Sequence, residues 1–328
     1  MRIVIIVIAV LFFGACDSSN PCVKTDNITA VPVTIPVERL EEALFSKTDQ
    51  LGVENFLTEN NTFSKVFLNS DQYPHDSILA LRISRLLQNK SIDTLFQEAI
   101  TEFGDISELT GTLEEGIGRL KSLYPDMPTP RLQTIVTGLY NDLYISDSLI
   151  IIGLDFFIGN DATYKPLEIP EYVLRRYNKE HLSAIILKFL AGDKVQAGNS
   201  STLLSEMIDF GKTYYLTKRL MPCTPDSILL GYSAMDMKRS LENESIIWAT
   251  LIQNEALYDT NHILKRRFLG ERPSVYEISQ DCPGRIGAWV GWRIVESYME
   301  QNNVSLLELV NQTDNYLIFR ESGYKPKS

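Results

Sequence analysis

The sequence is poor in the side chains that metal and redox chemistry needs. Three histidines and four cysteines occur in 328 residues, and His75, His181 and His262 are far apart in the chain. The cysteine spacings match no zinc motif. The sequence also has no Gly-x-Ser-x-Gly elbow and no glycine-rich phosphate loop. We therefore expect no metal, no cofactor and no catalytic residues.

Positive charge is also scarce. The chain has 31 Lys and Arg against 42 Asp and Glu, which gives a formal net charge of −11. Binding of a phosphate backbone requires clustered Lys and Arg, so we expect no nucleic acid partner. The same deficit argues against electrostatic adhesion to anionic lipid. Any attachment to a membrane must therefore come from an apolar group.

Only one apolar run is prominent, and it is too short to span a bilayer. It extends from Ile3 to Ala15 after the single charge of Arg2, whereas a spanning helix needs about 20 residues. A basic start, an apolar middle and small residues at the end are typical of a secretory signal peptide over residues 1–15. The following Cys16 resembles the acylated cysteine of bacterial lipoproteins. In the alternative, the signal is an ordinary one and Cys16 is not modified.

Residues 16–34 are rich in Ser, Asn, Asp and Pro without periodicity, and we expect them to form a tether. An exported protein reaches an oxidising compartment. One disulfide between Cys223 and Cys282 is conceivable, since Cys22 lies in the predicted tether. An interpretation without a disulfide is equally compatible with the sequence.

The remainder, residues 35–328, predicts a single globular domain of the α+β class that is predominantly helical. Helical periodicity covers residues 35–128, beginning in "VERLEEALF" from Val37. β-branched residues separated by turn signals predict a small sheet over 129–160. Helical patterns return over 165–328, where Asn178 is the expected N-cap of "KEHLSAIILKFLAG" and Gly192 its expected end.

A small sheet followed by a central helix resembles the thermolysin-like (gluzincin) zinc peptidases. Their central helix carries His-Glu-x-x-His, in which two histidines bind zinc and the glutamate activates water. The corresponding segment here, "HLSAIILKFLAG", has His181 but Ile185 four residues later. We therefore expect a degenerate peptidase-like scaffold without a metal. The residues expected to face any cleft are Ala184, Ile185, Lys188 and Phe189.

Two further segments suggest a binding site. Asp155 and Asp161 flank "DFFIGNDATY", which could bind calcium or form a solvated turn. In "DCPGRIGAWVGWRIVESYMEQN", Gly287 and Gly291 are one helical turn apart, and this spacing predicts close approach of another backbone. The alternative interpretation of this segment is a site at which Arg285 and Trp292 dock a partner.

Several segments together resemble the gliding motility lipoprotein family GldB of Bacteroidetes. They are the lipoprotein start, "VERLEEALF", "EYVLRRYNKEHL", "LIQNEALYDTN", "PGRIGAWVGWRIVESYM" and "LIFRESGYKP". The family is also distantly similar to predicted zinc peptidases that share the Pro-Gly-Arg-Ile-Gly block. The resemblance offers no active-site residue to transfer, and Cys16 is the only functional residue that it supplies.

The resemblance implies a lipid-anchored lipoprotein of the cell envelope, in the outer membrane, that is required for gliding motility. It further implies that the protein works with other proteins of the gliding and type IX secretion machinery, by contact and not as an enzyme. Two alternatives stay open from the residues. One is a divergent zinc-peptidase-like hydrolase, and the other is a lipoprotein that binds a peptide or glycan.

Overall fold

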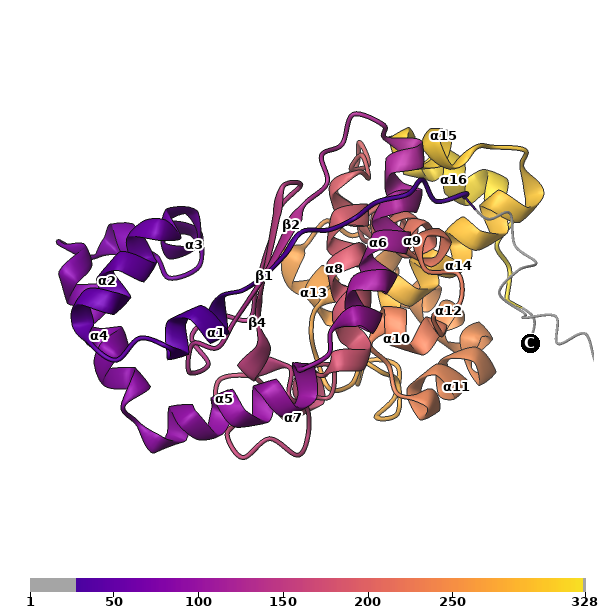
Figure 1. The fold of residues 1–328 in the computed structure, drawn as a ribbon. Helices are drawn as coiled ribbons and strands as arrows, with labels where there is room; N and C mark the ends of the chain where they lie inside the picture. The colour runs from indigo at the N-terminus through magenta and orange to yellow at the C-terminus, as the bar shows by residue number, and fades with distance from the viewer. Residues whose placement is uncertain (1–27, 327–328) are drawn as a thin grey trace, which may run out of the picture.

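The computed structural model describes residues 28–326 of the chain (Figure 1). The predicted signal peptide, Cys16 and Cys22 lie outside the described residues. None of the helices within this range is long and apolar enough to cross a membrane. The expectation of a tether is wrong for residues 28–34, because Ile28 and Val33 pack against the main core.

A four-stranded sheet lies in the middle of the molecule (Figure 1). The strands are β1 (Val37–Arg39), β2 (Arg131–Ile135), β3 (Leu143–Ile145) and β4 (Leu149–Gly153), in the order β1-β2-β4-β3. β1, β2 and β4 are parallel, and β3 is antiparallel to β4. The expected small sheet is therefore confirmed, but β1 was predicted to be helical.

The sheet separates two hydrophobic cores, because successive side chains of a strand point to opposite faces. In β4, Leu149 and Ile151 contribute to the smaller core, while Ile150 and Ile152 contribute to the larger one. All five residues of β4 are buried, which explains why this strand has an almost continuous apolar sequence.

The N-terminal helices form the smaller core against one face of the sheet. They are α1 (Leu40–Phe45), α2 (Gln50–Glu59), α3 (Asn61–Val66) and α4 (Asp76–Leu87), followed by α5 (Lys90–Phe103) and α6 (Ser107–Leu123). Phe56, Phe63 and Phe67 fill this core. Buried side chains of α5 and α6 belong to the larger core instead, so the helical segment predicted over 35–128 contributes to both cores.

The C-terminal helices form the larger core on the other side of the sheet (Figure 1). Its centre consists of α8 (Lys179–Asp193), α9 (Leu203–Leu220) and α14 (Ile286–Gln301), with α6 packed on α8. The remaining helices are α7 (Glu171–Leu174), α10 (Asp226–Leu230), α11 (Ala234–Glu242), α12 (Glu244–Gln253), α13 (His262–Leu269), α15 (Leu306–Asn311) and α16 (Asn315–Ser322). The α+β class with a helical majority is confirmed.

α9 and α14 pack with their backbones in direct contact. A Cβ atom added at Gly291 would lie 1.7 Å from the carbonyl oxygen of Met207, and one at Gly211 would lie 2.2 Å from the carbonyl oxygen of Gly291. Only glycine fits at these two positions. The close approach predicted from the glycine spacing in α14 is confirmed, and it fixes α9 and α14 behind the pocket described next.

Candidate functional site

A pocket of about 300 Å³ lies beside the first half of α8, and we call it the α8 pocket. Successive turns of α8 contribute His181, Ile185 and Lys188 to its lining. The other walls come from the start of β3, the segment before α8, the end of α10 and the residue Glu271 after α13. They comprise Asp142, Leu143, Phe157, Val173, Arg176, Tyr177, Ile228, Leu229, Leu230, Gly231 and Glu271.

Asn178 positions His181 at the start of α8. As the predicted N-cap, Asn178 accepts a hydrogen bond from the His181 amide through Oδ1 (3.2 Å), and the His181 ring Nδ1 lies 2.9 Å from the same oxygen. An amide oxygen only accepts, so Nδ1 carries the proton. Burial, together with Arg176, Arg175 and Lys188, lowers the pKa of His181 although Glu180 raises it. The imidazole is therefore neutral at pH 7.

The residues around His181 do not fit a zinc ion. Leu182 and Ile185 stand where the peptidase motif has its glutamate and its second histidine. Across residues 28–326, no group of three His, Cys, Asp or Glu side chains is arranged to hold a metal. The carboxylates of the α8 pocket instead form ion pairs and hydrogen bonds with neighbouring residues.

Glu271 is held between two arginines. Arg176 donates two parallel hydrogen bonds to the Glu271 carboxylate, with N–O distances of 3.0 and 2.9 Å. Nε of Arg285 lies 3.3 Å from Glu271 Oε1. Burial raises the pKa of Glu271, but Arg285, Arg176 and Lys188 outweigh it and hold this pKa below its usual value. Glu271 is therefore ionised and paired at neutral pH.

Arg285 does not line the α8 pocket but contacts Leu230 and Glu271, which do. It adopts a left-handed backbone conformation (φ 57°) directly before α14. Its guanidinium donates to the Tyr214 hydroxyl (3.2 Å) and to the Leu230 carbonyl, and it lies over the Tyr232 ring at 5.7 Å. These contacts tie α9, α10 and α14 together at the base of the α8 pocket.

The Tyr214 ring contacts both Lys188, which lines the pocket, and the buried Trp292. The ring stacks on Trp292 at a centroid distance of 5.6 Å, and Lys188 Nζ lies 5.5 Å from the Tyr214 ring centroid. Burial raises the pKa of the Tyr214 hydroxyl, yet Lys188, Arg285 and Arg176 lower it below its usual value. The electrostatic potential around this hydroxyl is therefore positive.

The expectation that Arg285 and Trp292 dock a partner directly needs correction. Trp292 is 4% exposed and stacks on the Tyr214 ring. The guanidinium of Arg285 is already bonded to Tyr214, Leu230 and Glu271. The residues that line the pocket include Ile185 and Lys188, as expected, whereas Phe189 is 57% exposed elsewhere. Sequence reasoning missed Arg176 and Glu271, because 95 residues separate these two partners and no local pattern marks such a pair.

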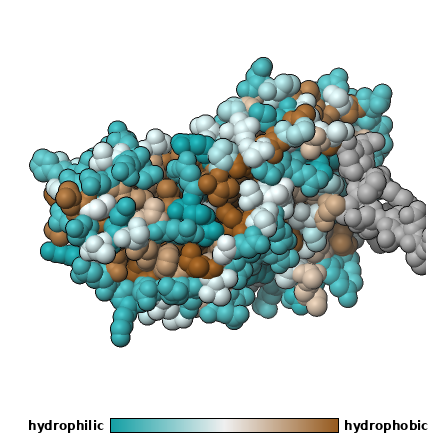
Figure 2. Space-filling model, in the orientation of Figure 1, coloured by the Kyte–Doolittle hydropathy of each residue, from teal (hydrophilic) through white to brown (hydrophobic). Residues whose placement is uncertain are grey.

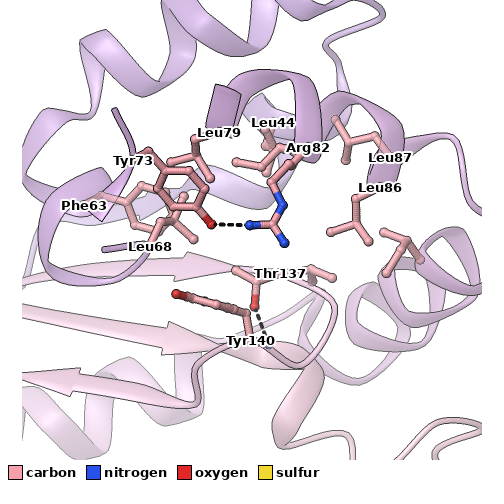
Figure 3. A pocket seen from close by; sticks show the side chains of 13 residues that line it. Leu44, Phe63, Leu68, Tyr73, Leu79, Arg82, Leu86, Leu87, Thr137 and Tyr140 are labelled. Carbon is pink, nitrogen blue, oxygen red and sulfur yellow. Dashed lines mark hydrogen bonds between the residues drawn. The ribbon is translucent and has the colours of Figure 1, made fainter. Parts of the chain in front are cut away.

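A second cavity, of about 260 Å³, lies between α4 and the loop that follows β2 (Figure 3). Its lining is mostly apolar, with leucines such as Leu79, Leu86 and Leu87. Arg82 donates to the Tyr73 hydroxyl (2.9 Å) at one wall. On the face drawn in Figure 2, hydrophobic residues form patches among hydrophilic ones. This second cavity has no cluster of charges comparable to that of the α8 pocket.

Asp155 and Asp161 do not form a calcium site. Asp161 is exposed in a turn, as the turn interpretation expected, whereas Asp155 is 1% exposed. Asp155 Oδ2 accepts hydrogen bonds from the amides of Thr137 (3.2 Å) and Leu139 (2.6 Å). Asp155 therefore holds the loop after β2, where Leu139 has a φ of 62°.

Stability between pH 4 and pH 6.5 is expected to depend on Asp155. Burial raises its pKa from 3.8 to about 6 although backbone hydrogen bonds lower it. The favourable contribution of the protonated folded form is complete below pH 3.8 and is lost as the pH rises to about 6. One pKa unit is worth about 1.4 kcal/mol, so the loss amounts to about 3 kcal/mol.

Urea denaturation of the wild type and Asp155→Asn across this pH range measures the effect. The wild type should lose about 2 kcal/mol of this total relative to Asp155→Asn between pH 4 and pH 6.5. Asp161→Asn, an exposed change six residues later, should follow the wild type. Parallel pH profiles of Asp155→Asn and the wild type would contradict the assignment.

The disulfide between Cys223 and Cys282 that the sequence left open does not form, because Cys282 is a buried free thiol. Cys282 lies beside the turn that leads into α14, and burial raises the pKa of its thiol to about 12. It is therefore protonated at physiological pH and poorly reactive.

The fold is of the α+β class, with a charged pocket beside the helix α8. On this helix, Leu182 and Ile185 stand where a His-Glu-x-x-His motif that began at His181 would have its glutamate and second histidine. Over residues 21–326 the sequence matches the family of the gliding motility protein GldB. Because the match covers nearly the whole chain, the protein belongs to this family, and the resemblance seen in the sequence is confirmed. Membership makes it a gliding motility lipoprotein of the cell envelope. Searches of curated proteins and of solved structures find no match.

Proposed function

We propose that the protein is anchored in the outer membrane through acylated Cys16 and supports gliding by contact with other proteins of the gliding and type IX secretion machinery. In this proposal it does not catalyse a reaction. Membership of the GldB family over residues 21–326 supports the role in gliding. The arrangement of the α8 pocket supports contact in place of catalysis.

The observation that carries the proposal is the pairing of the two carboxylates that line the α8 pocket. A hydrolase needs a base or a metal that is free to activate water. Here both carboxylates of the pocket are engaged, because Glu271 is neutralised by Arg176 and Arg285, and Asp142 accepts hydrogen bonds from the Tyr177 hydroxyl and the Leu143 amide. A pocket whose carboxylates are already engaged, and whose lining includes the ammonium of Lys188, is suited to binding. We also propose that this pocket occupies the place of the zinc cleft in a thermolysin-like scaffold.

Deletion of the gene, followed by complementation, tests the role in the cell. Deletion should stop spreading on a surface and reduce export through the type IX system, and the intact gene should restore both. Normal spreading and normal export in the deletion strain would contradict the proposal. Stoichiometric zinc in the purified full-length protein would instead favour the hydrolase.

Cys16→Ser is expected to release the protein from the membrane fraction. Acylation stabilises membrane attachment by about 0.8 kcal/mol per buried CH₂ group, so loss of the chains leaves no comparable anchor. The measurement is the distribution of the protein between membrane and soluble fractions of lysed cells. Cys22→Ser, the same change six residues later, is the matched control and should stay in the membrane fraction. Equal membrane retention of both variants would show that Cys16 is not the anchor.

A further inference from the structure

The charges of the α8 pocket do not balance. Arg176, Lys188 and Arg285 contribute three positive charges, and Glu271 and Asp142 contribute two negative ones. Glu271 pairs with both arginines. Asp142 accepts hydrogen bonds from the Tyr177 hydroxyl (2.7 Å) and the Leu143 amide (2.7 Å). One positive charge therefore remains in a protein whose net charge is −11.

Lys188 carries the charge that has no counterpart. Among residues 28–326, no carboxylate forms an ion pair with Lys188, and its ammonium lies 5.5 Å from the Tyr214 ring centroid. The lowered pKa of the Tyr214 hydroxyl, despite its burial, is consistent with this excess of positive charge. A lysine that lines a pocket without a carboxylate partner is suited to an anionic ligand.

The walls next to Lys188 are apolar. Leu143, Ile185 and Leu229 line the same pocket. A volume of about 300 Å³ is at the small end of the range for ligand pockets, which is about 300–1,000 Å³. The ligand must therefore combine a negative group with a short apolar body.

We propose that the α8 pocket binds the C-terminal carboxylate of a partner protein whose last residue is apolar. A terminal carboxylate has one negative charge, which equals the excess in the pocket, whereas a phosphate group has about −1.5 to −2 at pH 7. Capture of a chain terminus by fixed charges is an established mode of peptide binding. The proposal rests on the proposed function, since it names the part of a partner that makes the contact.

Calorimetric titration of the full lipidated protein in detergent micelles tests the site. The probes are N-acetylated tetrapeptides that end in leucine, valine, phenylalanine or alanine, each with a free carboxylate and with a terminal amide. Amidated tetrapeptides with an internal glutamate and inorganic phosphate are the competing anions. At least one free carboxylate peptide should bind at least about tenfold more tightly than its amide.

Lys188→Gln should weaken this binding by at least about tenfold. Lys65→Gln, which removes the same charge from an exposed position on α3, should leave it unchanged. Urea denaturation of each variant checks that the fold is kept. The proposal is overturned if no free carboxylate peptide binds or if acid and amide bind equally. It is also overturned if Lys188→Gln binds like the wild type, or if phosphate or the internal glutamate binds as tightly.

The same variants in cells separate this proposal from the function on which it rests. If peptides bind through Lys188 but the deletion strain glides normally, the role in gliding fails and the site stands. If the deletion strain stops gliding but no carboxylate peptide binds, the site assignment fails and the role in gliding stands. If both hold, Lys188→Gln cells should spread less than Lys65→Gln cells.

Discussion

Gly291→Ala is expected to lower the free energy of unfolding by at least about 3 kcal/mol. The added methyl group would lie 1.7 Å from the Met207 carbonyl oxygen and 2.3 Å from its carbonyl carbon. Because these are backbone atoms of α9, they cannot move aside as a flexible side chain could. The two helices must separate, and the core between them loses contacts along their length.

Two further glycine variants, with smaller expected effects, provide a comparison for Gly291→Ala. A methyl group at Gly287 would lie 3.1 Å from a Leu269 methyl and 3.2 Å from the Phe268 carbonyl oxygen. These contacts are much longer than those at Gly291, so Gly287→Ala should cost less than Gly291→Ala. At Gly111 in α6 nothing lies within 4 Å of the added atom, and Gly111→Ala should stabilise by about 0.5–1 kcal/mol.

Urea denaturation followed by tryptophan fluorescence measures the glycine series, since Trp289 and Trp292 lie on α14. If Gly291→Ala does not fold at all while Gly111→Ala does, the prediction holds in its strongest form. Equal midpoints for Gly291→Ala and Gly111→Ala would show that α9 and α14 do not make this backbone contact.

Sequence patterns correctly predicted the start of α8, which is set by residues a few positions away. Asn178 is the N-cap of α8 as expected, because its side chain is within reach of an amide three residues later. The end of this helix was placed too early at Gly192, since α8 continues to Asp193 with Lys194 as its C-cap. A glycine can also stand inside a helix, and only its surroundings decide which role it has.

β1 was missed because its cause is not local. The sequence "VERLEEALF" has helical periodicity, and the helix α1 does form from Leu40. The three residues before it, Val37–Arg39, become a strand only because β2, more than 90 residues later, provides a parallel partner. Such a short strand has no pattern of its own.

The α8 pocket shows the same division between local and distant causes. The face of α8 with His181, Ile185 and Lys188 follows from helical spacing. The pairing of Arg176 and Arg285 with Glu271 depends on where the fold places the segment after α7 and the loop between α13 and α14. The sequence could therefore show that His181 lacks a second histidine four residues later, but not that a charged pocket lies beside it.

Lys212→Met is expected to destabilise the protein by about 3–5 kcal/mol. Lys212 has no exposed side-chain surface, and its ammonium donates to the carbonyls of Gln196 and Gln312 at 2.9 Å each. It also forms an ion pair with Asp209 at 2.9 Å. Methionine fills a similar volume but leaves both carbonyls and the carboxylate without this donor.

Urea denaturation of Lys212→Met, compared with Lys238→Met, measures the cost. Lys238 is 65% exposed with one ion pair at 3.8 Å, so its loss should cost no more than about 1 kcal/mol. The double variant with Asp209→Asn should lose less than the sum of the two single changes, because the carboxylate left unpaired is then removed. A cost for Lys212→Met below that of Lys238→Met would contradict the buried role.

This prediction also bears on gliding. Lys212 and Tyr214 both belong to α9, but Lys212 does not line the α8 pocket. A strain with Lys212→Met should glide poorly because the protein is less abundant, whereas Lys188→Gln should reduce gliding at normal abundance. Immunoblots of both strains separate the two causes. Loss of abundance in Lys188→Gln cells would mean that Lys188 stabilises the fold and that its effect on gliding is indirect.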